Sequence, residues 1–104
     1  GDVKDKNVVI IDDMVDTAGT ITKAANLMME NGAKSVRAIA SHAVMSDPAS
    51  TRVDQSALTE MIFTDSIPYA KKCAKVKVLS IADMFAEAIR RVCSGESISS
   101  LYKI

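Results

Sequence analysis

Large aromatic side chains and an excess of either charge are what this sequence lacks most. Its 104 residues include no tryptophan, two tyrosines and two phenylalanines, and its 13 basic residues balance its 13 acidic residues. Balanced charge provides no bulk field that would attract nucleic acid or an anionic membrane surface. No apolar run approaches the length of a membrane span, and no secretory signal opens the sequence. We therefore expect neither nucleic acid nor a membrane among its partners.

Residues that bind metals or carry redox chemistry are also scarce. His42 is the one histidine, and a single histidine does not build a metal site here. Cys73 and Cys93 lack both a CxxC relation and the spacing of metal ligands. No Gly-x-x-x-x-Gly-Lys-[Ser/Thr] segment occurs, which excludes a P-loop. A reduced, cytoplasmic setting fits this pattern best, with both thiols as structural side chains.

Strand and helix patterns alternate along the chain and predict one α/β domain. The expected strands are residues 7–12, 35–41, 60–64 and 76–79. The expected helices are residues 20–31, residues 54–58 and a segment from Ser80 to about Gly95. Thr20 and Ser80 are the expected N-terminal caps, and Gly32 and Gly95 should lie just beyond the C-termini. This order predicts an open, mainly parallel sheet flanked by helices.

The most informative stretch lies where the first expected strand ends. The apolar run 8–11 indicates a buried strand, and the carboxylates of Asp12 and Asp13 stand at its carboxyl end. In an open parallel sheet, ligands bind at this edge. The loop 16–20 then leads into a helix, whose first backbone N–H groups and partial positive charge suit a phosphate. Acids that can hold hydroxyls thus lie a few residues from amides that can hold a phosphate, and a phosphorylated sugar presents both groups.

Each residue of this loop has a role in that interpretation. Thr17 and Thr20 supply hydroxyls that donate to phosphate oxygens. Gly19 lets the backbone approach the ligand closely, and Ala18 keeps the floor of the loop small. Asp16 would repel a phosphate, so its role is indirect, either as a base or as an acceptor of N–H groups that holds the loop open. The alternative is an ordinary strand–helix turn with solvated acids.

Residues 10–20 resemble the phosphoribosyl-pyrophosphate motif of the phosphoribosyltransferase-like fold, which is an apolar strand, an acid pair and Asp-Thr-x-Gly-Thr. The motif alone leaves two kinds of relative open: transferases that consume phosphoribosyl pyrophosphate and synthetases that make it. The further stretches 32–49, 76–80, 85–91 and 95–102 resemble the ribose-phosphate pyrophosphokinase family, also called phosphoribosyl-pyrophosphate synthetases. Their Ala-Glu-Ala-Ile-Arg-Arg and Gly-Glu-Ser-x-Ser segments are not features of the transferases, so we favour the synthetases.

The resemblance implies a two-domain enzyme much longer than 104 residues, with this chain as most of its C-terminal domain. A first residue Gly1 in place of methionine fits a piece of a longer protein. The family transfers the diphosphoryl group of ATP to the anomeric hydroxyl of ribose 5-phosphate, giving phosphoribosyl pyrophosphate and AMP. Its ATP-binding residues and catalytic loop lie mainly outside this chain, so we assign no catalytic residue here and expect the isolated chain to be inactive. Mg²⁺ assists the family reaction, and the sequence does not identify its protein ligands.

The resemblance also assigns roles by position. Asp12 and Asp13 would hold the ribose 2- and 3-hydroxyls. The 5-phosphate would be wrapped by Asp16, Thr17, Ala18, Gly19 and Thr20. Ser97 and Ser99 match a site that binds regulatory phosphate or ADP between subunits in the hexameric members, which implies a homo-oligomer, from dimer to hexamer. The alternative for these two serines is a capped C-terminal turn with no ligand.

Two positions depart from the family pattern, both within the turn-like segment 42–49. Ala43 and Asp47 stand where the family usually has Gly. Neither residue belongs to the sugar-phosphate loop. Asp47 adds a negative charge that would weaken the binding of an anionic regulatory ligand.

Three other interpretations fit parts of the sequence. A phosphoribosyltransferase of the same fold would share the ribose and phosphate contacts but use a nitrogenous base as acceptor. A non-catalytic regulatory homologue would keep the fold alone, although the intact acid pair and loop argue against decay of this site. A phosphoacceptor receiver domain also has acids after its first strand, with Asp65 as the acceptor. Such a domain has no use for the Asp-Thr-Ala-Gly-Thr loop.

Overall fold

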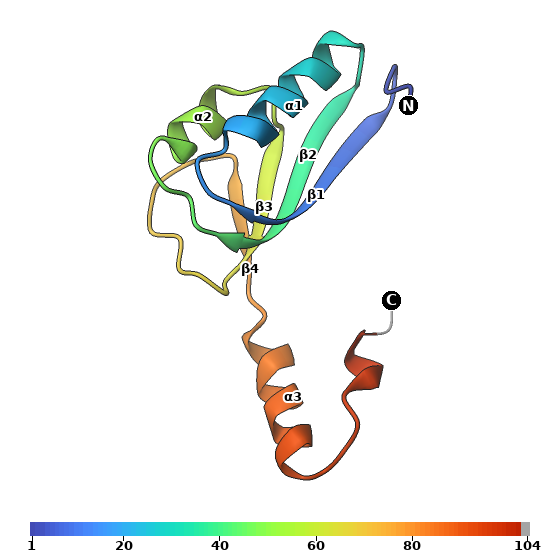
Figure 1. The fold of residues 1–104 in the computed structure, drawn as a ribbon, viewed down its shortest axis with the longest axis vertical. Coiled ribbons are helices and arrows are strands. Elements are labelled where there is room, and N and C mark those ends of the chain that lie inside the picture. Colours follow the sequence, from blue (N-terminus) through green and yellow to red (C-terminus); the bar gives the residue numbers. More distant parts are fainter. Residues whose placement is uncertain (103–104) are drawn as a thin grey trace.

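The computed structural model describes residues 1–102 and is built on one four-stranded parallel sheet (Figure 1). The strands lie in sequence order and are β1 (Asn7–Val15), β2 (Ser35–Ala43), β3 (Glu60–Thr64) and β4 (Val76–Leu79). The helices are α1 (Gly19–Glu30), α2 (Ala49–Gln55), α3 (Ala82–Cys93) and the 3₁₀ turn η1 (Ser99–Tyr102). The expected α/β class with a parallel sheet is confirmed. No helix within residues 1–102 is long and apolar enough to cross a membrane.

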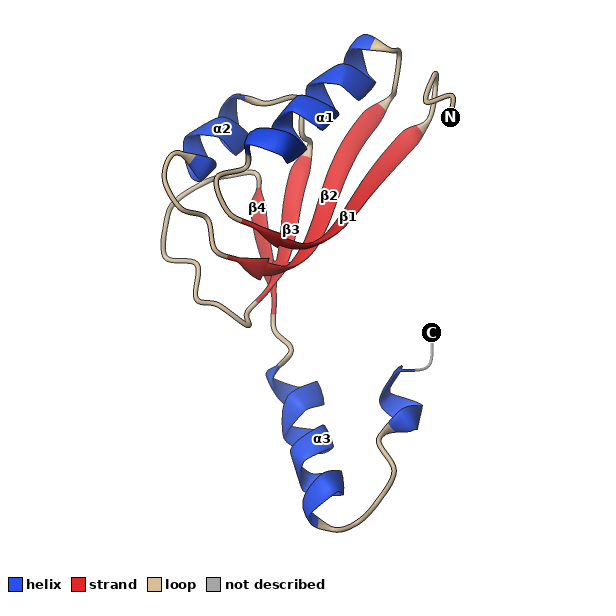
Figure 2. Cartoon of the chain, viewed as in Figure 1, coloured by secondary structure: helices blue, strands red, loops and turns tan. Residues whose placement is uncertain are grey.

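Helices α1 and α2 and the loop between β3 and β4 pack on the same face of the sheet (Figure 2). Each connection moves one strand further in the same direction, and right-handed crossovers in one direction place their connecting segments on one side. The loop is tied to the α2 region by Lys75 Nζ, which donates to the Ser56 carbonyl oxygen at 2.6 Å. It is also tied by a 2.8 Å hydrogen bond between Ser50 Oγ and the Tyr69 hydroxyl.

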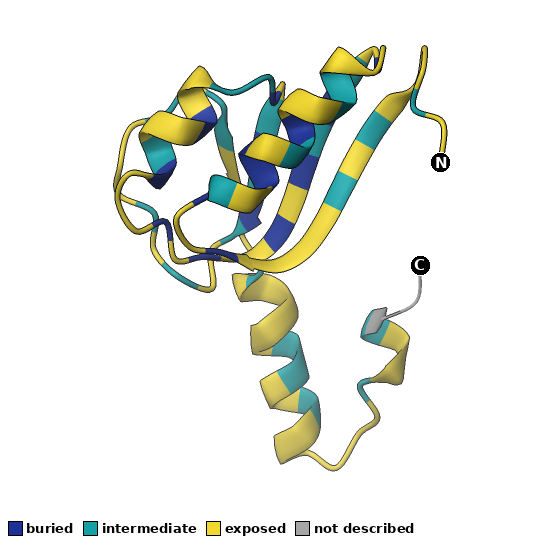
Figure 3. Cartoon of the chain, turned by 45° about the horizontal axis from the view of Figure 1, so that its top comes forward, coloured by how far each residue is buried: buried dark blue, intermediate teal, exposed yellow. Residues whose placement is uncertain are grey.

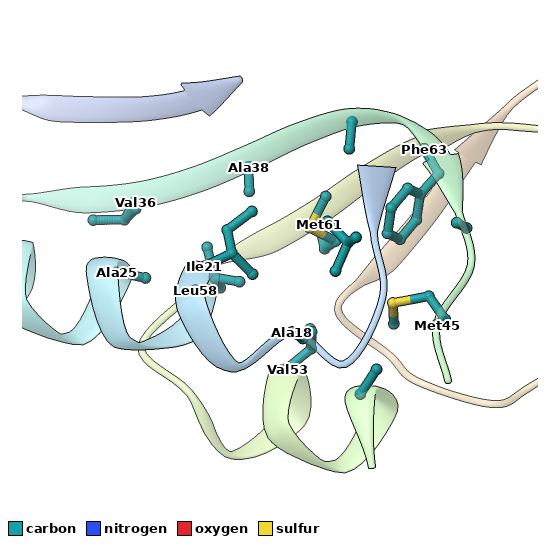
Figure 4. Close-up of a cluster of buried hydrophobic side chains, with 14 of the residues drawn as sticks. Ala18, Ile21, Ala25, Val36, Ala38, Met45, Val53, Leu58, Met61 and Phe63 are labelled. Atoms are coloured by element: carbon teal, nitrogen blue, oxygen red, sulfur yellow. The ribbon is translucent and has the colours of Figure 1, made fainter. Parts of the chain in front are cut away.

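The hydrophobic core lies between this covered face and the two helices (Figure 4). Ala25 of α1 and Ala38 of β2 are fully buried, and such small side chains let the helix approach the strand closely. Met61 and Phe63 of β3 fill more of the same layer. Ala18 belongs to this core although it lies in the loop before α1, so the loop that carries the sequence motif is anchored by packing.

The opposite face of the sheet carries an exposed apolar row. The strand register places Ile11, Ile39 and Ile62 side by side on β1, β2 and β3. Ile11 is 79% exposed and Ile39 is 40% exposed. Parallel sheets normally have both faces covered by helices. This chain therefore leaves uncovered a face that its own residue types suit for burial.

Helix α3 and η1 extend away from the sheet rather than covering that face (Figures 1 and 3). No residue of α3 is buried. The helix carries an apolar stripe that faces solvent, with exposed fractions of 49% for Phe85, 64% for Ile89 and 66% for Val92. The stripe is an amphipathic surface without a partner in the described chain.

Two element boundaries differ clearly from the sequence-based expectation. Strand β1 continues through the acid pair to Val15, which lies opposite Ala43 in the register with β2. The short helix α2 spans Ala49–Gln55 and not residues 54–58. Its first residue, Ala49, follows Pro48, which takes the cap position before the helix. The segment before α2 has a turn-like sequence, so the sequence pattern did not indicate where this helix begins.

The predicted N-terminal cap at Thr20 is wrong, the one at Ser80 is present in part, and the predicted C-terminal glycines are confirmed. Helix α1 starts at Gly19 after Ala18 with no side-chain cap, whereas the Ser80 hydroxyl accepts the N–H of Ala82, the first residue of α3, at 3.3 Å. The Ile81 N–H is bonded to Asp65 Oδ1 at 2.9 Å, from a loop distant in sequence. Gly32 and Gly95 follow α1 and α3 with φ of +93° and +76°, a left-handed conformation that glycine adopts without strain.

Candidate functional site

The loop between β1 and α1 borders a cavity of about 280 Å³ at the carboxyl edge of the sheet. This strand-side cavity is lined by Asp12, Met14, Val15, Asp16, Thr17, Ala18, Gly19, Thr20 and Ile21. The start of the loop is fixed by the Met45 N–H, which donates to the Val15 carbonyl oxygen at 3.0 Å. The structure thus brings Asp12 together with all five loop residues that the sequence singled out.

Ala18 sets the direction in which the chain enters α1. Its backbone is left-handed, with φ of 63° and ψ of 13°, and its side chain is only 4% exposed. The Ala18 carbonyl oxygen accepts hydrogen bonds from the Thr22 N–H at 3.2 Å and from Thr22 Oγ1 at 2.5 Å. This turn lets the loop fold over the end of β1 while its carbonyl closes the first turn of the helix.

The backbone N–H groups of the loop are available to a ligand. Within residues 1–102, no protein group accepts a hydrogen bond from the N–H groups of residues 16–20. Gly19 and Thr20 open α1, and the first N–H groups of a helix have no acceptor within it. The macrodipole of this 12-residue helix adds partial positive charge at the same place. A phosphate finds here the donors and the charge that it requires.

The two adjacent aspartates differ in their surroundings. Asp12 lines the strand-side cavity, whereas Asp13 does not. Asp12 Oδ1 accepts the Asp13 N–H, and Asp13 Oδ1 accepts the Met14 N–H, each at 2.8 Å. A hydrogen bond with the Asp12 side chain, the Met14 N–H and the nearby His42 hold the pKa of Asp13 below its ordinary value. Asp13 therefore carries a negative charge at neutral pH.

His42 lies at the carboxyl end of β2, opposite Met14 of β1. Its Nδ1 is 2.6 Å from Ser66 Oγ, which also donates to the Ser41 carbonyl oxygen at 3.0 Å. The sequence did not identify Ser66 as the partner of His42, because Ser66 comes from the loop after β3. This contact gives the histidine a structural explanation.

A second cavity of about 470 Å³ lies between α1 and α2 and shares Thr17, Gly19 and Thr20 with the strand-side cavity. This helix-side cavity is lined by Thr17, Gly19, Thr20, Thr22, Lys23, Asn26, Arg52, Gln55 and Ser56. Arg52 Nη1 donates to the Thr17 carbonyl oxygen at 3.1 Å. The sequence gave no signal for Arg52, since it stands 35 residues from Thr17 and in no motif.

The predicted regulatory serines lie in the segment after α3, apart from the two cavities (Figure 1). Ser97 Oγ and Ser99 Oγ are 3.0 Å apart, and Ser97 Oγ also accepts the Ser99 N–H at 3.2 Å. Arg91 Nη1 reaches the same segment, at 2.7 Å from Ser100 Oγ. The hydroxyls are thus engaged in local turn contacts.

The departure from the family pattern at Asp47 is neutralised within the chain. Lys71 Nζ lies 2.7 Å from Asp47 Oδ1 and also donates to the Met45 carbonyl oxygen at 2.8 Å. Lys71 therefore offsets the extra negative charge and ties the segment after β2 to the loop after β3.

Comparison with known proteins identifies the family. The model of the phosphoribosyl synthetase-associated domain matches residues 1–103. This chain belongs to that family. The resemblance to ribose-phosphate pyrophosphokinases, first seen in the motif and in the further stretches of sequence, is confirmed.

Several curated relatives of this family member are ribose-phosphate pyrophosphokinases. The protein from Porphyromonas gingivalis is 78% identical over 102 residues, which cover 98% of this chain and 33% of that protein. The protein from Helicobacter hepaticus is 52% identical, with the same coverage. The chain spans about a third of the length of these relatives.

A solved structure has the same fold. The crystal structure of phosphoribosylpyrophosphate synthetase from Mycobacterium smegmatis superimposes with a TM-score of 0.86 at 44% sequence identity. The match covers 91% of this chain and 33% of that one.

Proposed function

We propose that the longer protein containing this chain is a ribose-phosphate pyrophosphokinase, and that residues 12–20 bind its ribose 5-phosphate. One observation supports this most strongly. Asp12 lines the strand-side cavity together with five loop residues whose N–H groups have no acceptor within residues 1–102. The names of the relatives that are 78% and 52% identical support the same activity.

In this proposal, the two ends of the sugar phosphate are held by different parts of the site. The 5-phosphate accepts hydrogen bonds from the loop amides and from the hydroxyls of Thr17 and Thr20, while α1 adds its partial charge. Asp12 and Asp13 accept hydrogen bonds from the ribose 2- and 3-hydroxyls. Asp16 acts indirectly, by holding the loop open or as a base.

Holding both ends orients the anomeric hydroxyl toward ATP. Its oxygen forms a bond to the β-phosphorus, the bond from that phosphorus to the oxygen of AMP breaks, and the hydroxyl proton is lost. Such a reaction depends mainly on positioning and on neutralising phosphate charge. The contribution of this chain is positioning, because the ATP site is proposed to lie elsewhere in the longer protein.

We further infer that this chain is most of the C-terminal domain of a two-domain enzyme. The relatives are about three times as long, and the apolar row on the sheet needs cover that α3 does not provide. A segment of the longer protein outside residues 1–104 is the proposed cover. The isolated chain is then expected to bind ribose 5-phosphate weakly and to be catalytically inactive.

Mg²⁺ is the proposed cofactor. This ion usually binds through one or two carboxylates together with water and substrate phosphates. The carboxylates of Asp12 and Asp13 fit that kind of site, and residues 1–102 contain no group of three or more His, Cys, Asp or Glu side chains that would form a cage by themselves. When bound, the ion neutralises phosphate charge.

Regulation and assembly follow the family expectation in this proposal. Phosphate or ADP would bind near Ser97 and Ser99, between the subunits of a cytoplasmic homo-oligomer, from dimer to hexamer. Because these hydroxyls make local contacts in the chain, an effector would have to compete with those contacts.

An isotope-transfer assay on the natural-length protein tests the proposed function. ATP labelled in its β-phosphate and ribose 5-phosphate should give labelled phosphoribosyl pyrophosphate and unlabelled AMP, and Asp12→Asn should abolish most of the transfer. A phosphoribosyltransferase would instead release pyrophosphate from phosphoribosyl pyrophosphate when supplied with a nitrogenous base. Absence of label transfer would refute the proposal, and absence of both reactions would favour a regulatory homologue.

A further inference from the structure

The helix-side cavity contains a contact that bears directly on the phosphate loop. Arg52, in the last turn of α2, reaches across to α1 and donates from Nη1 to the Thr17 carbonyl oxygen at 3.1 Å. Among the side chains lining this cavity, Lys23 supplies the other positive charge, and it makes no hydrogen bond to the loop in the described structure. Arg52 thus touches the loop from the helix-side cavity and does not line the strand-side cavity.

Because the peptide unit is planar, a contact that fixes the Thr17 carbonyl also fixes the direction of the next N–H group. The Thr17 carbonyl and the Ala18 N–H belong to one planar trans peptide unit, so they point in opposite directions. A carbonyl held on Arg52 directs the Ala18 N–H away from the helix-side cavity. Thr17 lines both cavities, whereas Ala18 lines the strand-side cavity and not the helix-side cavity.

Gly19, which follows this peptide unit, leaves room for the guanidinium group of Arg52. A Cβ atom placed on Gly19 would lie 3.2 Å from Arg52 Nη1. Gly19 is the first residue of α1, where alanine would favour the helix by about 1 kcal/mol in intrinsic propensity. The backbone at Gly19 has no positive φ that would demand glycine. Glycine at this position therefore leaves Arg52 in place, whereas a Cβ atom would require the guanidinium group to move by a few tenths of an ångström.

We propose that Arg52 is a positioning residue for the phosphate loop, holding the Thr17–Ala18 peptide so that the Ala18 N–H faces the 5-phosphate. This assignment rests on the proposed binding of ribose 5-phosphate by residues 12–20. Arg52 does not contact the sugar phosphate itself. Its guanidinium group also places a positive charge behind the loop, so charge and orientation must be separated by experiment.

The test compares four variants of the natural-length protein. Arg52→Met removes the hydrogen bond and the charge, Arg52→Lys keeps the charge with a single-point donor, and Lys23→Met removes an equal charge from the same cavity without touching Thr17. Gly19→Ala keeps Arg52 but adds a Cβ atom that crowds its guanidinium group. The measurements are KM for ribose 5-phosphate, kcat, and hydrogen exchange at the Ala18 amide without ligand.

Arg52→Met should raise KM about tenfold, the usual effect of losing one hydrogen bond to a charged group. It should change kcat much less and speed exchange at the Ala18 amide. Arg52→Lys should recover part of the loss, and Lys23→Met should change KM less than twofold. Gly19→Ala should mirror Arg52→Met in KM and in exchange while keeping or raising the melting temperature.

Two results would overturn the assignment. An equal rise in KM for Lys23→Met and Arg52→Met would show that charge alone matters, and unchanged exchange at the Ala18 amide in Arg52→Met would show that the loop needs no anchor. If the wild-type protein neither binds nor converts ribose 5-phosphate, the proposed function fails. The exchange comparison would in that case still decide whether Arg52 orients the peptide.

Discussion

Ala18 combines a conformational cost with burial at the entrance to the site. A residue with a Cβ atom pays about 1–2 kcal/mol for the left-handed conformation, and Ala18 adopts it with φ of 63°. Its methyl group is buried in the core, where it contributes to packing. The loop therefore holds its shape because its smallest side chain is anchored, in keeping with the small loop floor that the sequence predicted.

Substitutions at Ala18 should separate these two effects. Ala18→Gly relieves the conformation but loses a buried methyl group and adds freedom to the unfolded chain, so the free energy of unfolding should change by less than about 1 kcal/mol. Ala18→Val combines a β-branched residue at positive φ with overpacking, and it should lower stability by more than about 2 kcal/mol. Urea unfolding of both variants checks this. Wild-type stability in Ala18→Val would show that the loop is not fixed as described.

The site also shows where sequence reasoning stops at the residue scale. Asp12 and the Asp-Thr-Ala-Gly-Thr loop could be found in sequence because neighbours along the chain share one cavity. Arg52 and Ser66 could not, because their partners Thr17 and His42 come from distant segments. Gly19 was expected to admit a ligand, and the structure shows that its missing side chain also admits Arg52.

At the scale of elements, the alternation of apolar residues was sufficient to place the sheet. Strands β3 and β4 have the predicted bounds, because short apolar runs between turn residues leave little choice. The cap of α1 was not predictable, since its first turn is held by the Ala18 carbonyl. At the start of α3 the neighbouring Ser80 hydroxyl was predictable, but Asp65, from a distant loop, was not. The apolar stripe of α3 was predictable, but what covers it was not.

Without packing, α3 relies on its own ion pairs. Glu87 Oε1 accepts hydrogen bonds from Arg90 Nη2 and Arg91 Nε, both at 2.8 Å. These guanidinium groups lower the pKa of Glu87 from 4.5 to about 2. A group with a lowered pKa in the folded state stabilises that state fully above its unfolded pKa, and the contribution is lost as the pH falls through the folded pKa.

Acid should therefore weaken α3 between about pH 4.5 and pH 2. The side-chain carboxyl signal of Glu87, followed by NMR, should titrate with a midpoint near 2, and the α3 amide shifts should move toward random coil over the same range. In Glu87→Gln, the amides should already be shifted at pH 6 and move less on acidification. A Glu87 midpoint near 4.5 would show that the ion pairs do not form in solution.

At the scale of the whole molecule, all connections lie on one side of the sheet. Successive right-handed crossovers in one direction place α1, α2 and the β3–β4 loop together and leave the other face bare. The sequence predicted a parallel sheet flanked by helices. It did not show that two helices share one face while the third extends away. A local sequence pattern does not indicate which element will cover a given face of the sheet.

The bare face should govern how the isolated chain behaves in solution. Its exposed apolar row should bind a dye such as ANS and promote self-association, because burying contiguous apolar surface is favourable. Ile39→Lys, at the centre of the row, should reduce both effects, with sedimentation velocity as the measurement. Lys77→Glu on β4, which changes a charge without removing apolar surface, is the control. Equal effects of the two variants would contradict the account.

The central claim is that residues 12–20 bind a sugar phosphate, and an NMR titration of this chain with ribose 5-phosphate tests it most directly. Plain ribose at the same concentrations is the control. The account predicts amide shifts centred on residues 12–20 with the phosphorylated sugar and not with ribose. Shifts centred elsewhere, equal shifts with ribose, or no shifts in both this chain and the natural-length protein would contradict it.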